Sequence, residues 1–215
     1  IMSTGILFDL DGTLLNTLED LCDGTNVALA QFGYPARTLA EVRRFLGNGA
    51  ANLIAQAVPA GADPAPVLAA FQSYYPGHCQ IKTAPYAGIL PALERLARAF
   101  PIAIVSNKPD AAVKPLCRHY FPGIFALGET AGCPRKPAPE MVYKAMEAIG
   151  ADRCIYVGDS EVDVRTAKNA GVPCLSVLWG FRDRAEIEQA GGTDFCDAPS
   201  ELADTLLHWG ENHGE

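Results

Sequence analysis

Two aspartates near the N-terminus are the first residues whose types and spacing could do chemistry. Asp9 and Asp11 directly follow the apolar residues 6–8, a run that is typical of a buried strand. Residues i and i+2 leave a strand on the same side, so both carboxylates can face one point beyond the strand end. Such a pair needs a cation or a shared proton to offset its repulsion. For the pair alone, a polar turn through Gly12 without any chemistry is an open alternative.

Polar residues also follow later apolar runs of the chain. They are Ser106 and Asn107, then Lys136, and then Asp159 with Asp163 one helical turn further on. Parallel strands end at one edge of their sheet, and ligands bind beyond that edge. Each of these residues alone is more typical of a turn, a helix cap or a solvated surface. Their recurrence after successive strands instead predicts one shared site.

The elements that must position these residues follow from the hydrophobic patterns. Between residues 16 and 79 only helical patterns occur, beginning with a helix that starts at Asn16 and has Glu19 as its capping partner. The further helices of this region are expected at 40–46, 50–58 and 66–75. After residue 88, strands are expected at 101–105, 124–127, 154–157, 173–178 and 194–196, and helices at 89–99, 111–120, 139–149, 161–170, 185–190 and 200–209.

This alternation predicts an α/β protein with a Rossmann-like three-layer core and a mainly parallel sheet. A small α-helical cap domain is inserted after the first strand. We expect residues 1–15 and 85–215 to form the core domain and residues 16–84 to form the cap domain. Because the insertion leaves the core next to the two aspartates, the cap should stand above them as a lid.

Charge and composition exclude several classes of function. The formal net charge of -8 argues against a nucleic-acid surface, and no basic cluster suits an anionic membrane. No apolar run reaches membrane-spanning length, and the N-terminal residues lack the layout of a signal peptide. The 7 cysteines form no C-x-x-C pair, which favours buried thiols in a reducing compartment. We therefore expect a cytoplasmic protein without nucleic-acid or membrane partners.

The residue types at the predicted site favour phosphate chemistry. Several carboxylates without a histidine suit a hard cation, with Mg²⁺ as the default. Such a cation, the Lys136 ammonium, a hydroxyl and an amide together neutralise phosphate oxygens. A carboxylate within reach can then attack phosphorus and displace the leaving oxygen, which gives an aspartyl-phosphate, while the second carboxylate moves protons.

These residues resemble the motif set of the haloacid dehalogenase superfamily over essentially the whole chain. The resembling residues are Asp9-Leu10-Asp11-Gly12-Thr13, Ser106-Asn107, Lys136, and Gly158-Asp159 with Asp163. The resemblance implies that Asp9 is the nucleophile and that Asp11 is the general acid/base. It also implies a Mg²⁺ ion held by Asp9, the Asp11 backbone carbonyl and Asp159, with support from Asp163.

The same resemblance implies how a substrate is held. Lys136 counts among the catalytic residues, and the substrate-binding residues of the core are Leu10, Gly12, Thr13, Ser106 and Asn107. Of these, Ser106 and Asn107 would hold the phosphoryl group together with Lys136. Thr13 would orient Asp11.

Further stretches resemble the phosphoglycolate phosphatases within this superfamily, namely residues 42–49, 106–109, 136–139 and 179–181. In the predicted cap, Gly47, Asn48 and Gly49 open a helix whose N–H groups could receive a substrate carboxylate, and Arg43 could add a bidentate contact. A plain turn between two helices and a solvated arginine are the alternative.

We therefore predict a Mg²⁺-dependent phosphatase that hydrolyses a small phosphorylated molecule, with 2-phosphoglycolate as the best candidate. A sugar phosphomutase similar to β-phosphoglucomutase, or a pyrophosphatase, is the enzymatic alternative on the same fold. A catalytically silent module that binds a phosphorylated metabolite is the non-enzymatic alternative. Its usual sign, a lost nucleophile or metal ligand, is not found in this sequence. A monomer and a homodimer both remain open.

Overall fold

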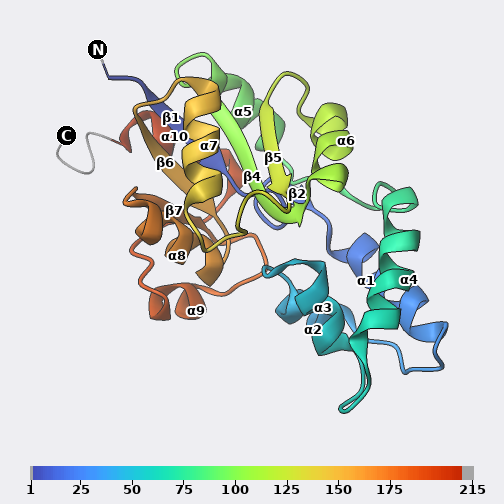
Figure 1. Ribbon diagram of the computed structural model, residues 1–215. Helices are drawn as coiled ribbons and strands as arrows, with labels where there is room; N and C mark the ends of the chain where they lie inside the picture. Colours follow the sequence, from blue (N-terminus) through green and yellow to red (C-terminus); the bar gives the residue numbers. More distant parts are fainter. Residues whose placement is uncertain (1, 210–215) are drawn as a thin grey trace.

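A computed structural model of the protein, described for residues 2–209, has a six-stranded sheet at its centre (Figure 1). The strands are β1 (Thr4–Phe8), β4 (Ile102–Pro109), β5 (Phe125–Glu129), β6 (Arg153–Gly158), β7 (Cys174–Val177) and β8 (Asp194–Cys196). They lie in the order β5-β4-β1-β6-β7-β8, and every neighbouring pair is parallel. The chain first adds β4 and β5 on one side of β1 and then adds β6, β7 and β8 on the other side. The strand order therefore reverses at β1.

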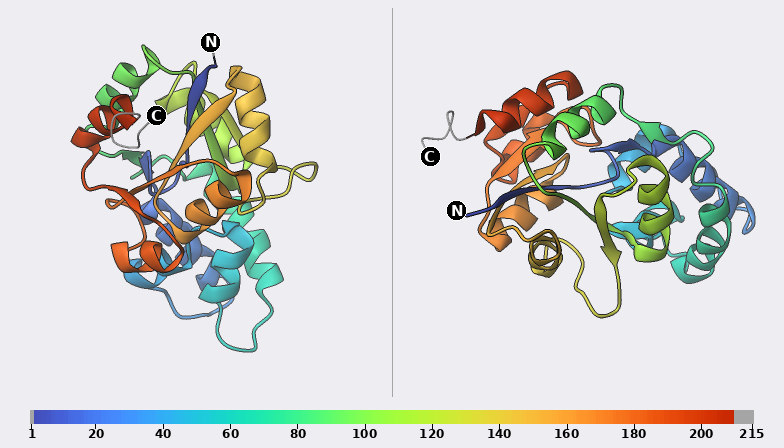
Figure 2. Two further views of the ribbon diagram at one scale, coloured as in Figure 1. Left: turned by 90° about the vertical axis from the view of Figure 1, so that its left-hand side faces the viewer. Right: turned by 90° about the horizontal axis from the view of Figure 1, so that it is seen from above.

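Side chains of the central strands are buried on both faces of this sheet. Ile6 and Phe8 of β1 belong to a cluster with α5 (Ile89–Ala97), α6 (Asp110–Tyr120) and α10 (Pro199–Leu207). Leu7 faces the other way and packs with α7 (Glu140–Ile149) and α8 (Glu161–Ala170). Figure 2 shows the sheet between the two helical layers. The buried strands explain the apolar runs in the sequence, and the predicted three-layer α/β core is confirmed.

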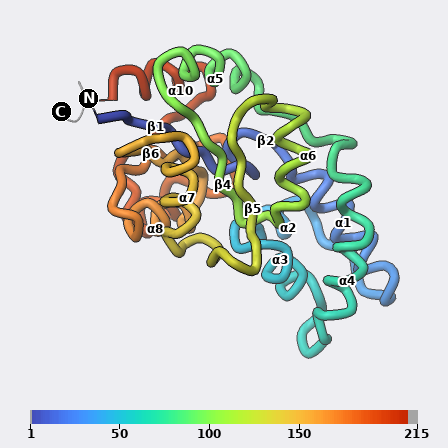
Figure 3. Tube along the Cα trace, turned by 45° about the horizontal axis from the view of Figure 1, so that its top comes forward, coloured from blue at the N-terminus to red at the C-terminus, as the bar shows by residue number. Residues whose placement is uncertain are grey.

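Four helices lie between residues 16 and 84 of the chain, and we call them the inserted helices. They are α1 (Leu18–Ala30), α2 (Leu39–Phe45), α3 (Gly49–Ala57) and α4 (Pro64–Tyr74), followed by the 3₁₀ turn η1 (Tyr75–Gly77). They pack against one another beyond the carboxyl ends of the central strands (Figures 1 and 3). Their buried side chains continue the apolar cluster of the sheet, so the two parts share one core.

The two connections to the inserted helices pair with each other. β2 (Leu15–Asn16) and β3 (Ala84–Pro85) form an antiparallel two-stranded sheet. The prediction that a helix begins at Asn16 was therefore wrong, because the extended backbone of Asn16 pairs with Ala84. The helix α1 starts two residues later, and its N-cap residue Thr17 makes no side-chain capping bond. The borders predicted at 15/16 and 84/85 fall inside this small sheet, and the division into two domains stays a prediction.

One strand is longer than its hydrophobic run suggested. β4 continues to Pro109, although its apolar residues end at Val105. The pairing of β4 with β5 is irregular between Val105 and Pro109, so the polar residues 106–108 lie in this irregular stretch at the edge of the sheet. Most other elements agree with the predicted ranges to within about two residues at each end, which is the usual uncertainty of helix ends. The remaining element, α9, spans Arg184–Gln189.

Candidate active site

Asp9 follows β1, the strand at which the strand order reverses. Its Oδ1 accepts hydrogen bonds from the backbone N–H of Leu10 at 2.7 Å and from the Lys136 ammonium at 2.9 Å. Its Oδ2 accepts none from the residues that the structure describes. Burial, and then repulsion from Asp163 and Asp159, raises the pKa of Asp9 against the attraction of Lys136. A cation near Oδ2 would favour the ionised form that a nucleophile needs.

The Lys136 ammonium is buried and uses its three N–H donors on three oxygens. It donates to Asp9 Oδ1 and Asp163 Oδ1, both at 2.9 Å, and to the Tyr156 hydroxyl at 3.0 Å. Burial alone would lower the pKa of Lys136, but the carboxylates of Asp163 and Asp9 outweigh it and raise this pKa. Lys136 is therefore a cation that fixes the Asp9 carboxylate. Its direct contact with a phosphoryl group stays a prediction.

Asp163, in the first turn of α8, has both carboxylate oxygens occupied. Oδ2 accepts the backbone N–H groups of Asp159 and Ser160, each at 3.1 Å, and the Ser160 hydroxyl at 2.9 Å. Oδ1 accepts the Lys136 ammonium and the Tyr156 hydroxyl. These five hydrogen bonds join the start of α8 to the lysine and make Asp163 a positioning residue.

Asp159 follows β6, and its carboxylate is buried beside the loop after β1. Oδ1 accepts the Thr13 hydroxyl at 3.2 Å, and Oδ2 accepts the Phe181 backbone N–H at 2.7 Å. The prediction that Thr13 orients Asp11 was wrong, because its one hydroxyl hydrogen points to Asp159 instead. Burial, and then repulsion from Asp163, raises the pKa of Asp159 to about 7.

Gly12 allows the loop after β1 to approach Asp159 closely. Its φ of +84° lies in the left-handed region, and a Cβ built on it would lie 2.3 Å from Asp159 Oδ2. A Cβ on Gly180 would likewise lie 2.3 Å from the Gly12 carbonyl oxygen. Gly12 and Gly180 therefore let the loops after β1, β6 and β7 meet around the Asp159 carboxylate.

The end of β4 contributes two polar side chains. Asn107 accepts the Lys136 backbone N–H at 2.7 Å and donates to the Lys136 carbonyl at 2.9 Å and to the Gly47 carbonyl at 3.3 Å. The Ser106 hydroxyl accepts the backbone N–H of Lys108 at 3.1 Å, which leaves its own hydrogen for another acceptor. Asn107 thus holds the Lys136 loop, and Ser106 is the group of this pair that can donate to a bound phosphate.

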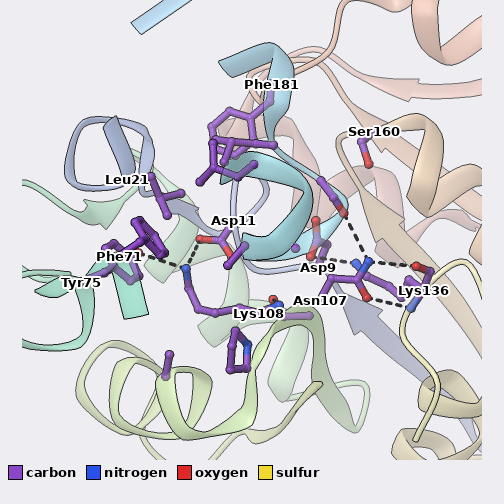
Figure 4. A pocket seen from close by; sticks show the side chains of 18 of the residues that line it. Asp9, Asp11, Leu21, Phe71, Tyr75, Asn107, Lys108, Lys136, Ser160 and Phe181 are labelled. Atoms are coloured by element: carbon purple, nitrogen blue, oxygen red, sulfur yellow. Dashed lines mark hydrogen bonds and ion pairs between the residues drawn. The ribbon is translucent and has the colours of Figure 1, made fainter. Parts of the chain in front are cut away.

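Asp11 is paired with a lysine that the sequence analysis did not single out. Lys108 Nζ lies 3.1 Å from Asp11 Oδ1 and donates to the hydroxyl of Tyr75 at 3.0 Å (Figure 4). Lys108 follows Ser106 and Asn107 directly, and this position in the same strand-end motif was the available signal. Tyr156 was missed as well, because its hydroxyl reaches the site from an apolar strand that gave no signal.

These residues surround a cavity of about 330 Å³ between the sheet edge and the inserted helices (Figure 4). The polar side chains that line it from the core include Asp9, Asp11, Ser106, Lys108, Lys136 and Asp159. The inserted segment lines it with Leu21, Gly47, Gly49, Leu53, Phe71 and Tyr75. A polar floor therefore faces a largely apolar roof, as in many small-molecule sites.

Other predicted substrate contacts have different partners. Arg43 does not line this cavity, since its guanidinium donates to the Gly180 carbonyl at 2.9 Å. Asn48 is also outside the cavity lining, and its carbonyl accepts from Arg135 at 3.0 Å. The guanidinium of Arg43 is thus bonded to the loop after β7 in this arrangement, and its contact with a substrate carboxylate stays a prediction.

Leu10, Gly12 and Thr13 lie in the turn after Asp9 but do not line the cavity. The N–H of Leu10 is bonded to Asp9 Oδ1, that of Gly12 to the Leu15 carbonyl, and that of Thr13 to the Leu10 carbonyl. These bonds shape the turn that carries the two aspartates. Substrate contact by the three residues stays a prediction.

A buried arginine joins the core to the inserted helices. Arg182 donates to the carbonyls of Arg43 at 3.1 Å, Arg44 at 3.2 Å and Leu46 at 2.7 Å, at the C-terminal end of α2. Its Nε donates to Glu161 Oε2 at 2.8 Å. A cation is favourable at the carbonyl end of a helix, where the backbone carries partial negative charge. Arg182 therefore fixes α2 over the site.

The donor set fits a hard divalent cation. Asp9, Asp159 and Asp163 each present a carboxylate oxygen within 4.8 Å of the others. Carboxylate oxygens without a nitrogen or sulfur ligand are the donors that Mg²⁺ prefers. Each oxygen of Asp163 accepts two or three hydrogen bonds, whereas each oxygen of Asp159 accepts one and Asp9 Oδ2 accepts none from the described residues. Asp9 and Asp159 are therefore the members best placed to bind a cation directly. The raised pKa values of both carboxyls fit the same interpretation.

The fold and this site define a class of protein: a doubly wound α/β domain with inserted helices over a carboxylate–lysine centre at the strand-order switch point. The chain belongs to the haloacid dehalogenase-like hydrolase family, whose sequence profile matches residues 6–177. The predicted membership is thereby confirmed. Among residues 2–209, the structure contains no helix that is both long and apolar enough to span a membrane.

Two proteins named as phosphoglycolate phosphatases are similar to most of the chain. The chain is 34% identical over 220 residues to a phosphoglycolate phosphatase of Mesorhizobium japonicum, an alignment that covers 94% of this chain and 96% of the relative. It is 33% identical to a crystal structure of a Lactobacillus delbrueckii protein that is provisionally named a phosphoglycolate phosphatase. This match covers 96% of this chain and 99% of the other with a TM-score of 0.89.

A further solved structure resembles the chain less closely. It is a mutant of CbbY from Rhodobacter sphaeroides in complex with xylulose-(1,5)bisphosphate. The two chains share 25% identity with a TM-score of 0.72, and the match covers 94% of this chain and 96% of CbbY. A similar fold thus occurs in a protein that binds a phosphorylated sugar.

Proposed function

We propose that this hydrolase is a Mg²⁺-dependent phosphatase that acts on a small phosphomonoester, with 2-phosphoglycolate as its best candidate substrate. The observation that carries the proposal is the Asp9 carboxylate on the cavity floor, with Oδ1 held by Leu10 and Lys136 and Oδ2 left without a hydrogen bond from the described residues. The names of the similar relatives from Mesorhizobium japonicum and Lactobacillus delbrueckii support this substrate.

In the first step, Asp9 attacks the phosphorus atom, and the bond between phosphorus and the ester oxygen breaks. Asp11, which lines the same cavity, gives a proton to the departing oxygen. Lys136 keeps Asp9 oriented, and the Ser106 hydroxyl donates to a phosphoryl oxygen. A Mg²⁺ ion held by Asp9, Asp159 and the Asp11 carbonyl would offset negative charge on the phosphoryl oxygens.

In the second step, water hydrolyses the aspartyl-phosphate. Asp11, now without its proton, takes one from the water as the water oxygen bonds to phosphorus. The bond between phosphorus and Asp9 breaks, inorganic phosphate leaves, and both carboxyls return to their starting protonation. One side chain thus serves as acid and then as base, as a two-step displacement requires.

We also propose that residues 16–84 act as a cap domain on a core of residues 1–15 and 85–215. The paired strands β2 and β3 are the connection about which such a cap could turn. A cytoplasmic location is supported by the 7 cysteines, all of which are free thiols in the described part of the chain.

The test is a phosphate-release assay with Mg²⁺ across small phosphomonoesters, including 2-phosphoglycolate, with the Asp9→Asn variant as the control. We expect release from phosphoglycolate by the unaltered protein and none above background by the variant. Isomerisation of a hexose phosphate without phosphate release would indicate a phosphomutase, and release from pyrophosphate alone would indicate a pyrophosphatase. Failure to hydrolyse even p-nitrophenyl phosphate would indicate a binding module.

A further inference from the structure

A buried ammonium lies beside Asp11, and the proposed reaction steps do not use it. Lys108 lies near the carboxyl end of β4, and its side chain is 6% exposed. Its Nζ contacts Asp11 Oδ1 at 3.1 Å and the Tyr75 hydroxyl at 3.0 Å, and it borders the cavity (Figure 4). An ammonium has three N–H donors, and in the described part of the chain Lys108 Nζ makes a hydrogen bond to Tyr75 and an ion pair without hydrogen-bond geometry to Asp11 Oδ1. At least one donor is therefore left for a molecule in the cavity.

The surroundings of this ammonium come from both parts of the molecule. Tyr75 belongs to η1, beyond the last inserted helix, whereas Lys108 and Asp11 belong to the core. The Tyr75 ring stacks on Phe71 with centroids 5.0 Å apart, and Leu21 lines the same side of the cavity (Figure 4). Lys108 is thus a buried positive charge beside Asp11 and the Tyr75 hydroxyl, and the inserted segment adds the apolar side chains of Leu21 and Phe71 to this corner.

The other cations that line the cavity are committed elsewhere. Lys136 directs its three donors to Asp9, Asp163 and Tyr156. Arg182 is held by the backbone carbonyls at the end of α2 and by a glutamate. An anionic group on the leaving part of a substrate, which must lie next to Asp11, therefore meets Lys108 as its counter-charge.

On the basis of the proposed phosphatase function, we propose that Lys108 and Tyr75 bind a carboxylate of the substrate and so select phosphate esters of small 2-hydroxy acids. Asp11 protonates the ester oxygen, so the carbon attached to this oxygen lies beside Asp11. A carboxylate on that carbon reaches the neighbouring ammonium and the Tyr75 hydroxyl. The apolar walls formed by Leu21 and Phe71 disfavour a charge elsewhere in this corner and offer few partners to sugar hydroxyls.

This assignment differs from the one that the sequence suggested. The predicted carboxylate site used Arg43 together with Gly47 and Gly49, but Arg43 is bonded to the Gly180 carbonyl and lies outside the cavity lining. Because Lys108 is on the core and Tyr75 on the inserted segment, a carboxylate bound between them contacts both. Substrate binding would then also hold the inserted helices over Asp11.

The experiment compares two substrates that differ by the carboxylate, 2-phosphoglycolate and ethyl phosphate. For each enzyme, the ratio of the two kcat/KM values is measured, so that any general effect of a substitution on Asp11 cancels. The variants are Lys108→Met, Lys108→Arg and Tyr75→Phe. The matched control is Lys144→Met on the exposed face of α7, where Lys144 Nζ donates to the Gly132 carbonyl at 3.3 Å.

We expect Lys108→Met to lower the ratio by about 10–100-fold, the value of a hydrogen bond between charged groups. Tyr75→Phe should lower the ratio less, Lys108→Arg should keep most of it, and Lys144→Met should leave it unchanged.

An equal loss of kcat/KM on both substrates, or no loss on either, would overturn the assignment while leaving the phosphatase function intact. If Lys108→Met does not fold, an unchanged ratio in both Lys108→Arg and Tyr75→Phe would overturn it. No hydrolysis of either ester or of p-nitrophenyl phosphate by the unaltered enzyme would refute the proposed function itself.

Discussion

The side-chain amide of Asn107 hydrogen-bonds to both backbone polar groups of Lys136, with its Oδ1 2.7 Å from the N–H nitrogen and its Nδ2 2.9 Å from the carbonyl oxygen. These bonds join the end of β4 to the loop before α7. The same loop places the Lys136 ammonium on Asp9. One uncharged side chain therefore sets the position of the cation that orients the proposed nucleophile.

Replacing Asn107 with alanine should damage both stability and activity. The substitution leaves a buried N–H and a buried carbonyl of Lys136 without partners, which costs about 1–3 kcal/mol in the free energy of unfolding. Displacement of the ammonium by about 1 Å should lower kcat by about 100-fold. Urea unfolding and steady-state kinetics measure the two effects.

The matched control for this prediction is Asn169→Ala. The Asn169 amide also bonds to the Lys136 loop, donating to the Pro137 carbonyl at 2.8 Å, but at an exposed position. We expect this variant to lose less than about 0.5 kcal/mol and to keep its kcat. Equal kcat values for the Asn107 and Asn169 variants would contradict the positioning role.

The two later aspartates should differ in how they affect Mg²⁺ binding. Asp163→Asn disturbs a positioning residue whose oxygens are already hydrogen-bonded, so the affinity for Mg²⁺ should fall by about 10–100-fold. Asp159→Asn removes a proposed direct ligand and should abolish measurable binding. Isothermal titration calorimetry with MgCl₂ measures the Mg²⁺ affinity of both variants. A larger loss of affinity in Asp163→Asn than in Asp159→Asn would show that Asp163 is the direct ligand and Asp159 the positioning residue.

The raised pKa of Asp159 should make the stabilising effect of Mg²⁺ depend on pH. With a pKa of about 7 in the folded protein against an ordinary value of 3.8, this carboxyl binds its proton more tightly when folded. The contribution of Asp159 to the stability of the metal-free protein therefore falls as the pH rises from about 4 to about 7, as the carboxyl ionises. Mg²⁺ binds the ionised form, so it should raise the melting temperature more near pH 8 than near pH 5.5.

Thermal unfolding in EDTA and in MgCl₂ over this pH range measures the effect. The Asp159→Asn variant has no carboxyl at this position, so the contribution of Asp159 to the pH dependence should disappear in it. A Mg²⁺-induced shift that is the same at both pH values in the unaltered protein would contradict the account.

Arg182→Ala should loosen the inserted helices. The substitution leaves three backbone carbonyls at the C-terminal end of α2 without the hydrogen-bond donor that Arg182 supplies. It also removes the ion-pair partner of Glu161. We expect faster proteolysis at the connections near β2 and β3 and a KM at least about tenfold higher, because the cavity roof is no longer fixed. Arg184→Ala is the control, since Arg184 is exposed and lies 3.5 Å from Asp197. Equal proteolysis rates for the two variants would remove Arg182 from this role.

The fold and the floor of the site could be predicted because their signals are local. Asp9, Ser106 and Asp159 each interrupt an apolar run near the end of a buried strand, and parallel strands end at one edge of the sheet. Short sequence patterns were therefore enough to bring these residues together. The start of α1 was misjudged at Asn16 because the pairing of Asn16 with Ala84 joins distant segments.

The roof of the site could not be predicted, since it depends on how the inserted helices lie on the sheet. Arg182 and Leu46 are 136 residues apart in the chain, and Lys108 and Tyr75 are 33 apart. Nothing in the local pattern of Arg43 shows that the Gly180 carbonyl occupies its guanidinium. Such contacts follow from tertiary packing, which has no periodic signature in the sequence.

The central claim is that Asp9 carries the phosphoryl group during the reaction. The most direct measurement uses 2-phosphoglycolate that is radiolabelled in its phosphoryl group. The enzyme is quenched with acid during turnover, and the labelled peptide is then identified by peptide mapping. The account predicts acid-stable label on the peptide that contains Asp9, and none in the Asp9→Asn variant. Label on a different residue, or undiminished turnover by Asp9→Asn, would contradict it.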